Sequence, residues 1–468
     1  MQKKYSYFIY FLVLVLGVTL FSCKDQFNHE DYTAYFGGEI ENPKNNYLIF
    51  MKGDQVIDTF HLDKNNRFFH KFDSLTPGLY SFKNEPEYQY VYFEKNDSLL
   101  IQLNANDFDN SLVFCGRGDE KNNFLMELYL QNEADRNALF EAYEKDVKYF
   151  EKSCKNSYNK AKSLYLKRKA FIKWGAEFDK LALASVELNN AYKKEVYPIA
   201  HEFRTGNTIK NKLPADYYNY RKAIDLNESA LVNYSPFVNY ITVLLNNIVL
   251  TESQTMDDEM SLKNNILKLE IANKLIKNNH VKNLVVNNIA NMYLLSDQCT
   301  ENNTKFFNLY AKIATDEKLK KQIMATAKKI HKLHEHAKLP ELTLTDTKGN
   351  KVLLPSAIKQ KTVLFFWTKE SESHAIFAHK KIAELKAKYP NYQFVAINVD
   401  ENTNDWQTEL NKHTFEPAFE LHTSNFEELK EKWIINKIHR TMIINANGTI
   451  KNAFVSLFDV NFEDHLKD

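Results

Sequence analysis

The sequence predicts a multidomain chain with an N-terminal antiparallel β-domain, a helical middle region and a C-terminal α/β domain. Three observations support this. Short β-rich runs alternate with turn residues over 32–118, apolar residues recur at helical spacing over 119–337, and strands alternate with helices over 338–468. Glycine (11) and proline (10) are scarce, which argues against an all-β or loop-rich chain. The chain length suggests two to four domains.

The β-domain is predicted from runs that follow one another about every 8–12 residues, a spacing typical of an antiparallel sandwich or barrel. Turn signals such as Asn42-Pro43, Thr76-Pro77-Gly78 and Lys95-Asn96-Asp97 separate these runs. The expected strands are Tyr35 to Ile40, Tyr47 to Met51, Val56 to Leu62, Phe68 to Phe72, Leu79 to Phe82, Tyr88 to Phe93, Leu99 to Leu103 and Leu112 to Phe114.

The middle region is predicted to be a helical layer that connects the two end domains. Leu139, Tyr143, Val147 and Phe150 recur at spacings of four, four and three, which indicates one face of a helix. Similar faces occur around Phe171 to Leu188, Leu231 to Leu250, Leu262 to Ile276 and Leu284 to Leu295. The many charged residues between them are expected to form the solvated sides of these helices.

The C-terminal region alternates between strand and helix patterns, which predicts a parallel or mixed sheet with helices packed on it. The expected elements are a strand at Leu342 to Leu344, a strand at Thr362 to Trp367, a helix with Ala378, Ile382, Leu385 and Tyr389 on one face, a strand at Phe394 to Val399 and a helix at Phe426 to Trp433. The runs Thr441 to Asn445 and Thr449 to Val455 flank Asn447-Gly448, a dipeptide that favours a β-hairpin.

The N-terminus reads as an export signal. Lys3 and Lys4 precede an apolar run from Phe8 to Leu20, which is shorter than the roughly 20 residues of a membrane-spanning helix. The run ends in Leu20-Phe21-Ser22-Cys23, which resembles the bacterial lipobox. This resemblance implies a signal peptide over 1–22, acylation of Cys23, and a tether over 23–31 that holds the chain to the inner or outer membrane of a bacterial envelope, facing the periplasm. An ordinary membrane anchor is the alternative.

Charge and cysteine content exclude two further classes. Lys and Arg total 61 against 60 Asp and Glu, so the chain lacks the basic excess expected of a nucleic-acid-binding protein. Beyond Cys23 the chain has only Cys115, Cys154 and Cys299, an odd number that cannot form a complete disulfide framework. Cys115 is expected to be buried at a strand end. Cys154 and Cys299 are expected in polar surroundings between helices. The sequence leaves undecided whether they form a disulfide in an oxidising compartment.

The C-terminal order of elements, with Val363-Leu364-Phe365-Phe366-Trp367 entering a helix, resembles the thioredoxin fold of membrane-anchored thiol–disulfide proteins and their peroxiredoxin-like relatives. Further matching segments are Ala396-Ile397-Asn398-Val399-Asp400 and Ile443-Ile444-Asn445-Ala446-Asn447-Gly448-Thr449-Ile450. The β-domain resembles the small domain that precedes the thioredoxin domain in lipoproteins of Bacteroidetes-type bacteria, through Gly38-Glu39-Ile40, Pro77-Gly78-Leu79-Tyr80, Phe114-Cys115-Gly116-Arg117-Gly118 and Asn122-Asn123-Phe124-Leu125.

The resemblance also locates an active site whose chemistry is missing. Active relatives place Cys-x-x-Cys after the Phe-Trp strand, where the helix N-terminus stabilises a thiolate. Here Ser371 takes the place of the attacking cysteine and His374 that of the resolving one. His439, after Ile438, takes the place of the family's cis-proline, and we expect a trans bond there because a non-proline cis bond costs about 2.5–4 kcal/mol. A redox-inactive thioredoxin-like domain is therefore expected.

Other chemistry at these positions has little support. Ser371 and His374 lack the third group and the oxyanion hole that a hydrolytic serine needs, so Ser371 or Ser373 is expected to cap the helix, with Glu370 and Glu372 at its positive end. His331, His334 and His336 do not converge in the way that zinc ligands do, so we expect neither a metal nor a cofactor.

The sequence thus predicts a tethered envelope lipoprotein whose last domain binds a protein or peptide. The candidate groove residues are Trp367, Glu370, Ser371, Glu372, Ser373, His374, Ile438, His439 and Arg440. Two alternatives remain open at this point. One is thiol–disulfide exchange through Cys154 or Cys299, and the other is a purely structural role in the envelope.

Overall fold

The computed structural model describes residues 32–85, 87–253, 261–296, 300–413, 415, 418–435, 437–459 and 461–467. Contacts divide the chain into two compact units. The first contains the described residues up to Arg136 together with Asn159–Leu183, and the second contains Asn137–Tyr158 together with Ala184 onward. Segments of the helical region therefore belong to both units. Cys23 and the predicted signal peptide and tether lie outside the described residues, as does Cys299.

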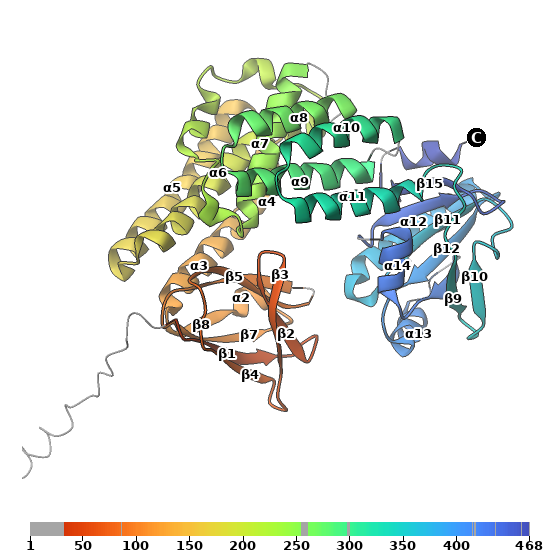
Figure 1. Ribbon diagram of the computed structural model, residues 1–468, viewed down its shortest axis with the longest axis horizontal. Coiled ribbons are helices and arrows are strands. Elements are labelled where there is room, and N and C mark those ends of the chain that lie inside the picture. Colours follow the sequence, from red (N-terminus) through yellow and green to blue (C-terminus); the bar gives the residue numbers. More distant parts are fainter. Residues whose placement is uncertain are drawn as a thin grey trace, which may run out of the picture. The chain divides into compact units, whose positions relative to one another are not determined.

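Two four-stranded sheets form the β-domain of the first unit (Figure 1). The strand orders are β4-β1-β7-β8 and β3-β2-β5-β6. All strand pairs in these sheets are antiparallel except β1 with β7, which run parallel. The bounds are β1 Ala34–Glu41, β2 Tyr47–Lys52, β3 Gln55–His61, β4 Arg67–Phe72, β5 Gly78–Asn84, β6 Glu87–Phe93, β7 Ser98–Asn104, the short helix α2 Phe108–Ser111, and β8 Val113–Arg117.

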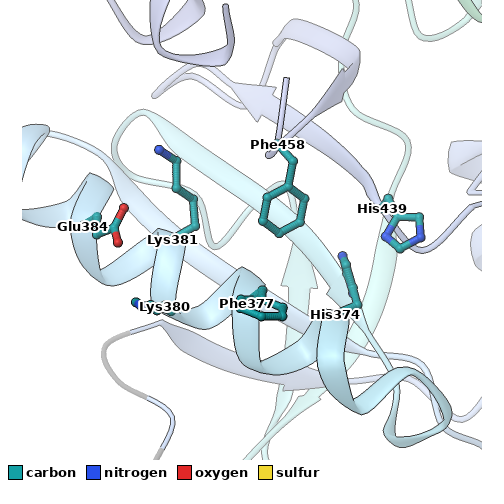
Figure 2. Close-up of a pocket in the computed structure, with 7 residues that line it drawn as sticks. All are labelled: His374, Phe377, Lys380, Lys381, Glu384, His439 and Phe458. Atoms are coloured by element: carbon teal, nitrogen blue, oxygen red, sulfur yellow. The ribbon is translucent and has the colours of Figure 1, made fainter. Parts of the chain in front are cut away.

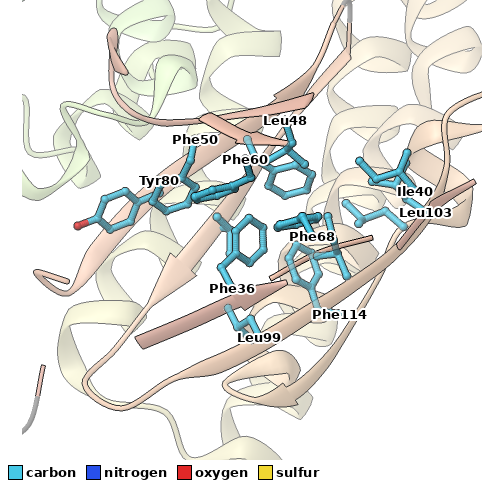
Figure 3. Close-up of a cluster of buried hydrophobic side chains, with 14 of the residues drawn as sticks. Phe36, Ile40, Leu48, Phe50, Phe60, Phe68, Tyr80, Leu99, Leu103 and Phe114 are labelled. Atoms are coloured by element: carbon cyan, nitrogen blue, oxygen red, sulfur yellow. The ribbon is translucent and has the colours of Figure 1, made fainter. Parts of the chain in front are cut away.

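An aromatic-rich core fills the space between the two sheets (Figure 3). Phe36 on β1 contacts the rings of Phe50 and Phe68 with centroids 5.5 and 5.2 Å away. Because successive side chains of a strand point to opposite faces, the residues that flank these core positions face away from the core. Phe36, Phe50, Phe68, Leu99 and Phe114 are all almost fully buried.

Helix α3 (Asp119–Ala134) closes an edge of each sheet with two neighbouring asparagines. The Asn122 amide accepts from the Tyr92 backbone N–H at 2.7 Å and donates to the Tyr92 carbonyl at 3.0 Å. Asn123 makes the same pair of bonds with Phe114, at 2.9 and 2.8 Å. A side-chain amide carries one acceptor and one donor group, so each asparagine substitutes for a neighbouring strand at one residue of β6 or β8.

The remaining helices of the middle region are α4 Arg136–Ala142, α5 Val147–Ile172, α6 Ala176–Thr205, α7 Ser235–Ser253, α8 Leu262–Leu275, α9 Asn279–Ser296, α10 Thr300–Ile313 and α11 Glu317–His331. The apolar segment Ile241 to Leu250 lies within α7, most of it buried. Among the described residues, no helix combines the length and apolar character needed to cross a bilayer.

One predicted helix face is divided between two helices. Leu139 lies on α4 and Phe150 on α5, because the Asp146 carboxylate accepts from the Tyr149 backbone N–H at 2.8 Å and starts a new helix. The prediction of one continuous helix was wrong here. Leu139, Tyr143, Val147 and Phe150 nevertheless pack in a single apolar cluster with Cys154, Tyr197 and Tyr217.

The cysteine environments differ from those expected. Cys115 on β8 is exposed, because its parity on the strand places it opposite the buried Phe114. Cys154 on α5 is 2% exposed and lies within the aromatic cluster rather than in polar surroundings. Burial raises the pKa of its thiol to about 12.

The C-terminal part of the second unit is a mixed seven-stranded sheet with order β10-β9-β13-β12-β11-β14-β15. Strands β11, β12 and β13 run parallel, and β14 pairs antiparallel with β11. The bounds are β9 Leu342–Asp346, β10 Lys351–Leu354, β11 Thr362–Trp367, α12 Glu372–Lys388, β12 Gln393–Asn398, α13 Thr403–Lys412, β13 Phe419–His422, α14 Phe426–Trp433, β14 Arg440–Ile444 and β15 Ile450–Ser456. The predicted fold class is confirmed, whereas β10, α13 and β13 were not predicted.

Candidate functional site

The candidate site lies where β11, an interior strand of the sheet, passes into helix α12. The strand ends at Trp367, Thr368 follows it, a single 3₁₀ turn spans Lys369–Ser371, and α12 begins at Glu372. Thr368 Oγ1 accepts from the Glu370 backbone N–H at 3.3 Å and so caps the 3₁₀ turn. Ser371 occupies the N-cap position of α12, but its side chain makes no capping hydrogen bond.

Asp400, which follows β12, fixes this loop through hydrogen bonds to Thr368 and Lys369. Its carboxylate accepts a short hydrogen bond from the Thr368 hydroxyl and a bond from the Lys369 backbone N–H at 3.1 Å. Asn398 Nδ2 donates to the same carboxylate at 2.7 Å. Asp400 is 6% exposed, so its bonds are well shielded from water. The loop is therefore fixed where the chain could present a reactive group.

Two imidazoles meet at the head of α12. The ring centroids of His374 and His439 lie 4.4 Å apart with the planes at 77°, so the edge of one ring faces the other. His374 Nδ1 is buried without a hydrogen-bond partner. Burial, with smaller contributions from the neighbouring His439 and His379, lowers the pKa of His374 to about 4. His374 is therefore neutral near pH 7.

The two histidines line a pocket of 610 Å³ (Figure 2). Phe377 is 60% exposed and Phe458 is 46% exposed, so the pocket offers apolar ring surface to solvent. Lys381 on its rim contacts Glu463 at 3.4 Å. The full lining is His374, Phe377, Lys380, Lys381, Glu384, His439 and Phe458. The pocket therefore combines exposed apolar rings with two imidazoles and a charged rim.

Behind the pocket lies a buried histidine–glutamate pair. His379 Nε2 is 2.9 Å from Glu420 Oε1, and Trp367 Nε1 donates to Glu420 Oε2 at 3.1 Å. His379 Nδ1 contacts the Ala375 carbonyl at 2.7 Å, and a carbonyl only accepts, so Nδ1 carries a hydrogen. Nε2 is the ring nitrogen that faces the Glu420 carboxylate. Phe415 stacks on His379 with centroids 3.9 Å apart.

Arg440 shapes the loop that carries His439. Its guanidinium donates to the carbonyls of Trp433 (2.7 Å) and Ala453 (2.7 Å), with a short bond to Ile434. Ile434 adopts a left-handed conformation at the end of α14, with φ of +56°. The Ile438–His439 bond is trans, and among the described residues the cis bond is Leu354–Pro355. The Arg440 guanidinium thus fixes the loop that follows α14.

The predicted groove residues separate into two groups. His374 and His439 line the pocket, with Phe377, Lys380, Lys381 and Glu384 from α12 and Phe458, which were not predicted. Trp367 is fully buried, and Glu370, Glu372 and Ser373 are exposed outside the lining. Ile438 is half-buried and, like Ser371 and Arg440, does not line the pocket. Phe377 follows His374 by three residues, and Lys381 and Glu384 continue this helical spacing, which is the signal that could have identified the face.

One further cluster has the composition of metal ligands. Glu372, Glu409 and His413 bring ligand atoms within 4.8 Å of one another. Lys412 Nζ lies 2.7 Å from Glu372 Oε1, and this ammonium is the main reason that the pKa of Glu372 is lowered. The cluster is a surface ion-pair network.

The three histidines that the sequence analysis weighed as zinc ligands lie on the surface. The rings of His331 and His334 lie 5.3 Å apart, and His331, His334 and His336 are all exposed.

Comparison with known proteins assigns the fold of this region. The family model for thioredoxin-like proteins matches residues 359–450. The chain is similar to the solved structure of a candidate thiol-disulfide oxidoreductase from Bacteroides vulgatus, with 22% identity, a TM-score of 0.27, and coverage of 29% of this chain and 96% of that one. It is similar to a thioredoxin-like protein from Bacteroides caccae at 17% identity and a TM-score of 0.34, over 53% and 89% of the two chains.

A third solved structure is a candidate thiol:disulfide interchange protein from Chlorobium tepidum. It shares 21% identity at a TM-score of 0.23, over 25% of this chain and 83% of that one. No curated protein matches the chain. Residues 359–450 match the thioredoxin-like family model, and the C-terminal sheet with its helices is a thioredoxin-like α/β domain.

Proposed function

We propose that the chain is a membrane-tethered envelope lipoprotein whose thioredoxin-like domain is redox-inactive and binds a protein or peptide. The observation that supports this most directly is the pocket at the head of α12, where His374 and His439 meet beside two exposed phenylalanines. The resemblance to thioredoxin-like proteins implies that active relatives carry the two cysteines of Cys-x-x-Cys at this position. Here the sequence contains no cysteine after Cys299, so the domain has no thiol of its own.

The competing proposal of thiol–disulfide exchange finds little support in Cys154. A thiol that is 2% exposed, with its pKa raised to about 12, is neither accessible nor ionised near neutral pH. Cys299 lies outside the described residues. Insulin reduction by dithiothreitol provides the test. The purified chain should not accelerate the reaction above background, and turnover that disappears after alkylation of its cysteines would contradict redox inactivity.

Binding is tested separately by photo-crosslinking in the native envelope. A photoreactive phenylalanine at Phe377 should form a discrete adduct, whereas the same group at Phe203 on α6, which is 82% exposed, serves as the matched control. Phe458→Glu should abolish the adduct, because it places a charge on the apolar wall of the pocket. If no adduct forms at Phe377, or if the same adduct forms at Phe203, the pocket is not the binding site and a structural role gains support.

The tether has its own test. Cys23→Ala should abolish incorporation of labelled palmitate, because it removes the thiol that is acylated. Palmitate incorporation by this variant would contradict lipid anchoring at Cys23.

A further inference from the structure

The sheet β4-β1-β7-β8 turns an apolar face outward. The strand register places Phe69, Gly37, Leu100 and Cys115 side by side across all four strands, in one row. Phe69 is 66% exposed and Leu100 is 44% exposed, and Cys115 is exposed as well. We call these residues, with Tyr35 and Val113, the outer face.

The apolar side chains of the outer face form a continuous surface because Gly37 leaves room between them. A Cβ atom at Gly37 would lie 2.8 Å from Phe69 Cδ2 and 3.1 Å from Leu100 Cδ2, so these two side chains already lean over the glycine. Tyr35 stacks on Phe69 with ring centroids 5.8 Å apart. Val113, at the next outward position of β8, is 48% exposed. Contiguous exposed apolar surface of this kind marks contact with a partner or a membrane.

The charges of the sheet are distributed unevenly along its strands. The row beside the apolar one consists of Lys71, Tyr35, Ser98 and Arg117, with two basic residues and no acidic one. Lys71 pairs with Asp73 at 3.0 Å, but both side chains are more than half exposed, so this pair is weak. Glu39 and Glu41 lie toward the opposite end of β1. The basic row is the one nearest the N-terminal end of β1.

That end of β1 is also where the chain leaves the described residues toward Cys23. Residues 24–31 separate Cys23 from Tyr32, and a chain of this length spans at most about 30 Å. A lipid on Cys23 would therefore hold Tyr32, two residues before β1, within that distance of the bilayer. Anionic headgroups attract lysine and arginine, and apolar side chains enter the boundary region of the bilayer.

We propose that the outer face, with its apolar row Phe69–Leu100–Cys115 and its basic row Lys71–Arg117, lies against the lipid surface to which Cys23 anchors the chain. This inference rests on the proposed lipid tether. The β-domain would then have a function separate from the thioredoxin-like domain. Docking of this face would fix the orientation of the first unit on the bilayer, which a flexible tether alone does not do.

Cys115 provides a natural probe of this contact. The chain from Lys24 onward, with an N-terminal hexahistidine segment and Cys299→Ser, is attached to nickel-chelating vesicles of phosphatidylethanolamine and phosphatidylglycerol. A bimane label on Cys115 should shift its emission to the blue and lose its quenching by iodide upon attachment. The matched control carries Cys115→Ser and Val56→Cys on β3, where the side chain is 52% exposed. Its label should remain quenched.

The artificial tether separates this test from the one on Cys23. If Cys23→Ala shows that no lipid anchors the chain, the vesicle result still reports on the outer face. Phe69→Glu with Leu100→Glu should restore the quenching of Cys115 without changing the urea midpoint, since both side chains face solvent. Equal quenching of the two labels on vesicles would overturn the proposal. Protection of Cys115 in native envelopes but not on vesicles would also overturn it, in favour of a protein partner.

Discussion

At the scale of single residues, His374 is the group whose chemical behaviour the folded environment changes most clearly. The sequence places a titratable group at the head of a helix, whereas the structure buries its Nδ1 without a partner beside a second imidazole. Protonation of His374 in the folded state therefore places a charge in an unfavourable setting. In the unfolded chain the same group titrates near its usual value of 6.5.

This difference predicts a pH-dependent loss of stability. Because the folded pKa is lowered to about 4, the unfolded state binds a proton first as the pH falls. The folded state loses stability as the pH falls from 6.5 to 4, by about 2–3 kcal/mol after allowance for the partial exposure of the imidazole. Urea unfolding at pH 7.0 and 4.5 should show a smaller decrease for His374→Gln than for the unchanged chain. Equal decreases would contradict the assignment, as would an NMR titration of His374 near 6.5.

Arg440 allows a second prediction at the same scale. Burial lowers the pKa of this guanidinium to about 9, which leaves it charged at neutral pH while it donates to three carbonyls. Arg440→Lys cannot supply this fork of donors and should destabilise the domain by about 2 kcal/mol or more. Denaturant titration measures this loss. Lys451→Arg on the neighbouring strand β15, whose side chain is partly exposed, is the control and should leave stability unchanged.

At the level of elements, regular patterns were predicted well and contacts between segments were not. Strand β11 and helix α14 have the predicted bounds, because an uninterrupted apolar run and a capped amphipathic turn are local signals. Strand β13 was missed because its four residues include only two buried ones, and its pairing with β12 and β9 is distant in sequence. The division between α4 and α5 was missed because Asp146 read as one more charged residue on a helix.

The same reasoning applies to the candidate site. The positions of His374 and His439 followed from resemblance, but their contact needed the fold to bring residues 65 positions apart together. Phe377 was missed although it shares a helix face with His374 by spacing, and Phe458 was missed because no local pattern relates it to that face. Trp367 was predicted to line the groove because of the Phe-Trp motif, but it is fully buried and belongs to the core.

Helix α3 offers the clearest test at the level of elements. Asn122 is 1% exposed, so Asn122→Ala leaves the Tyr92 N–H and carbonyl without the partners that the amide supplied. We expect a loss of about 2–3 kcal/mol in the free energy of unfolding. Asn123→Ala, at a half-buried position, should cost less. Similar losses for the two variants, measured by urea unfolding, would show that burial does not determine the strength of these bonds.

For the whole molecule, the two described cysteines outside the thioredoxin-like domain report on different events. Cys115 is exposed on the first unit and Cys154 is buried in the second. In the detergent-solubilised folded chain, maleimide should label Cys115 within minutes and should leave Cys154 unmodified until urea unfolds the second unit. Peptide mass spectrometry after timed labelling measures both rates. Labelling of Cys154 without denaturant would revive the redox alternative.

The paired asparagines of α3 also decide where the chain can be cut. A fragment that stops at Gly118 keeps every strand of the β-domain, yet it removes the amides that occupy β6 at Tyr92 and β8 at Phe114. Both strands would then offer free main-chain groups to other molecules, so such a fragment should assemble into oligomers or precipitate. Isolating the β-domain for structural work requires retaining α3, even though that helix looks dispensable from the order of strands alone.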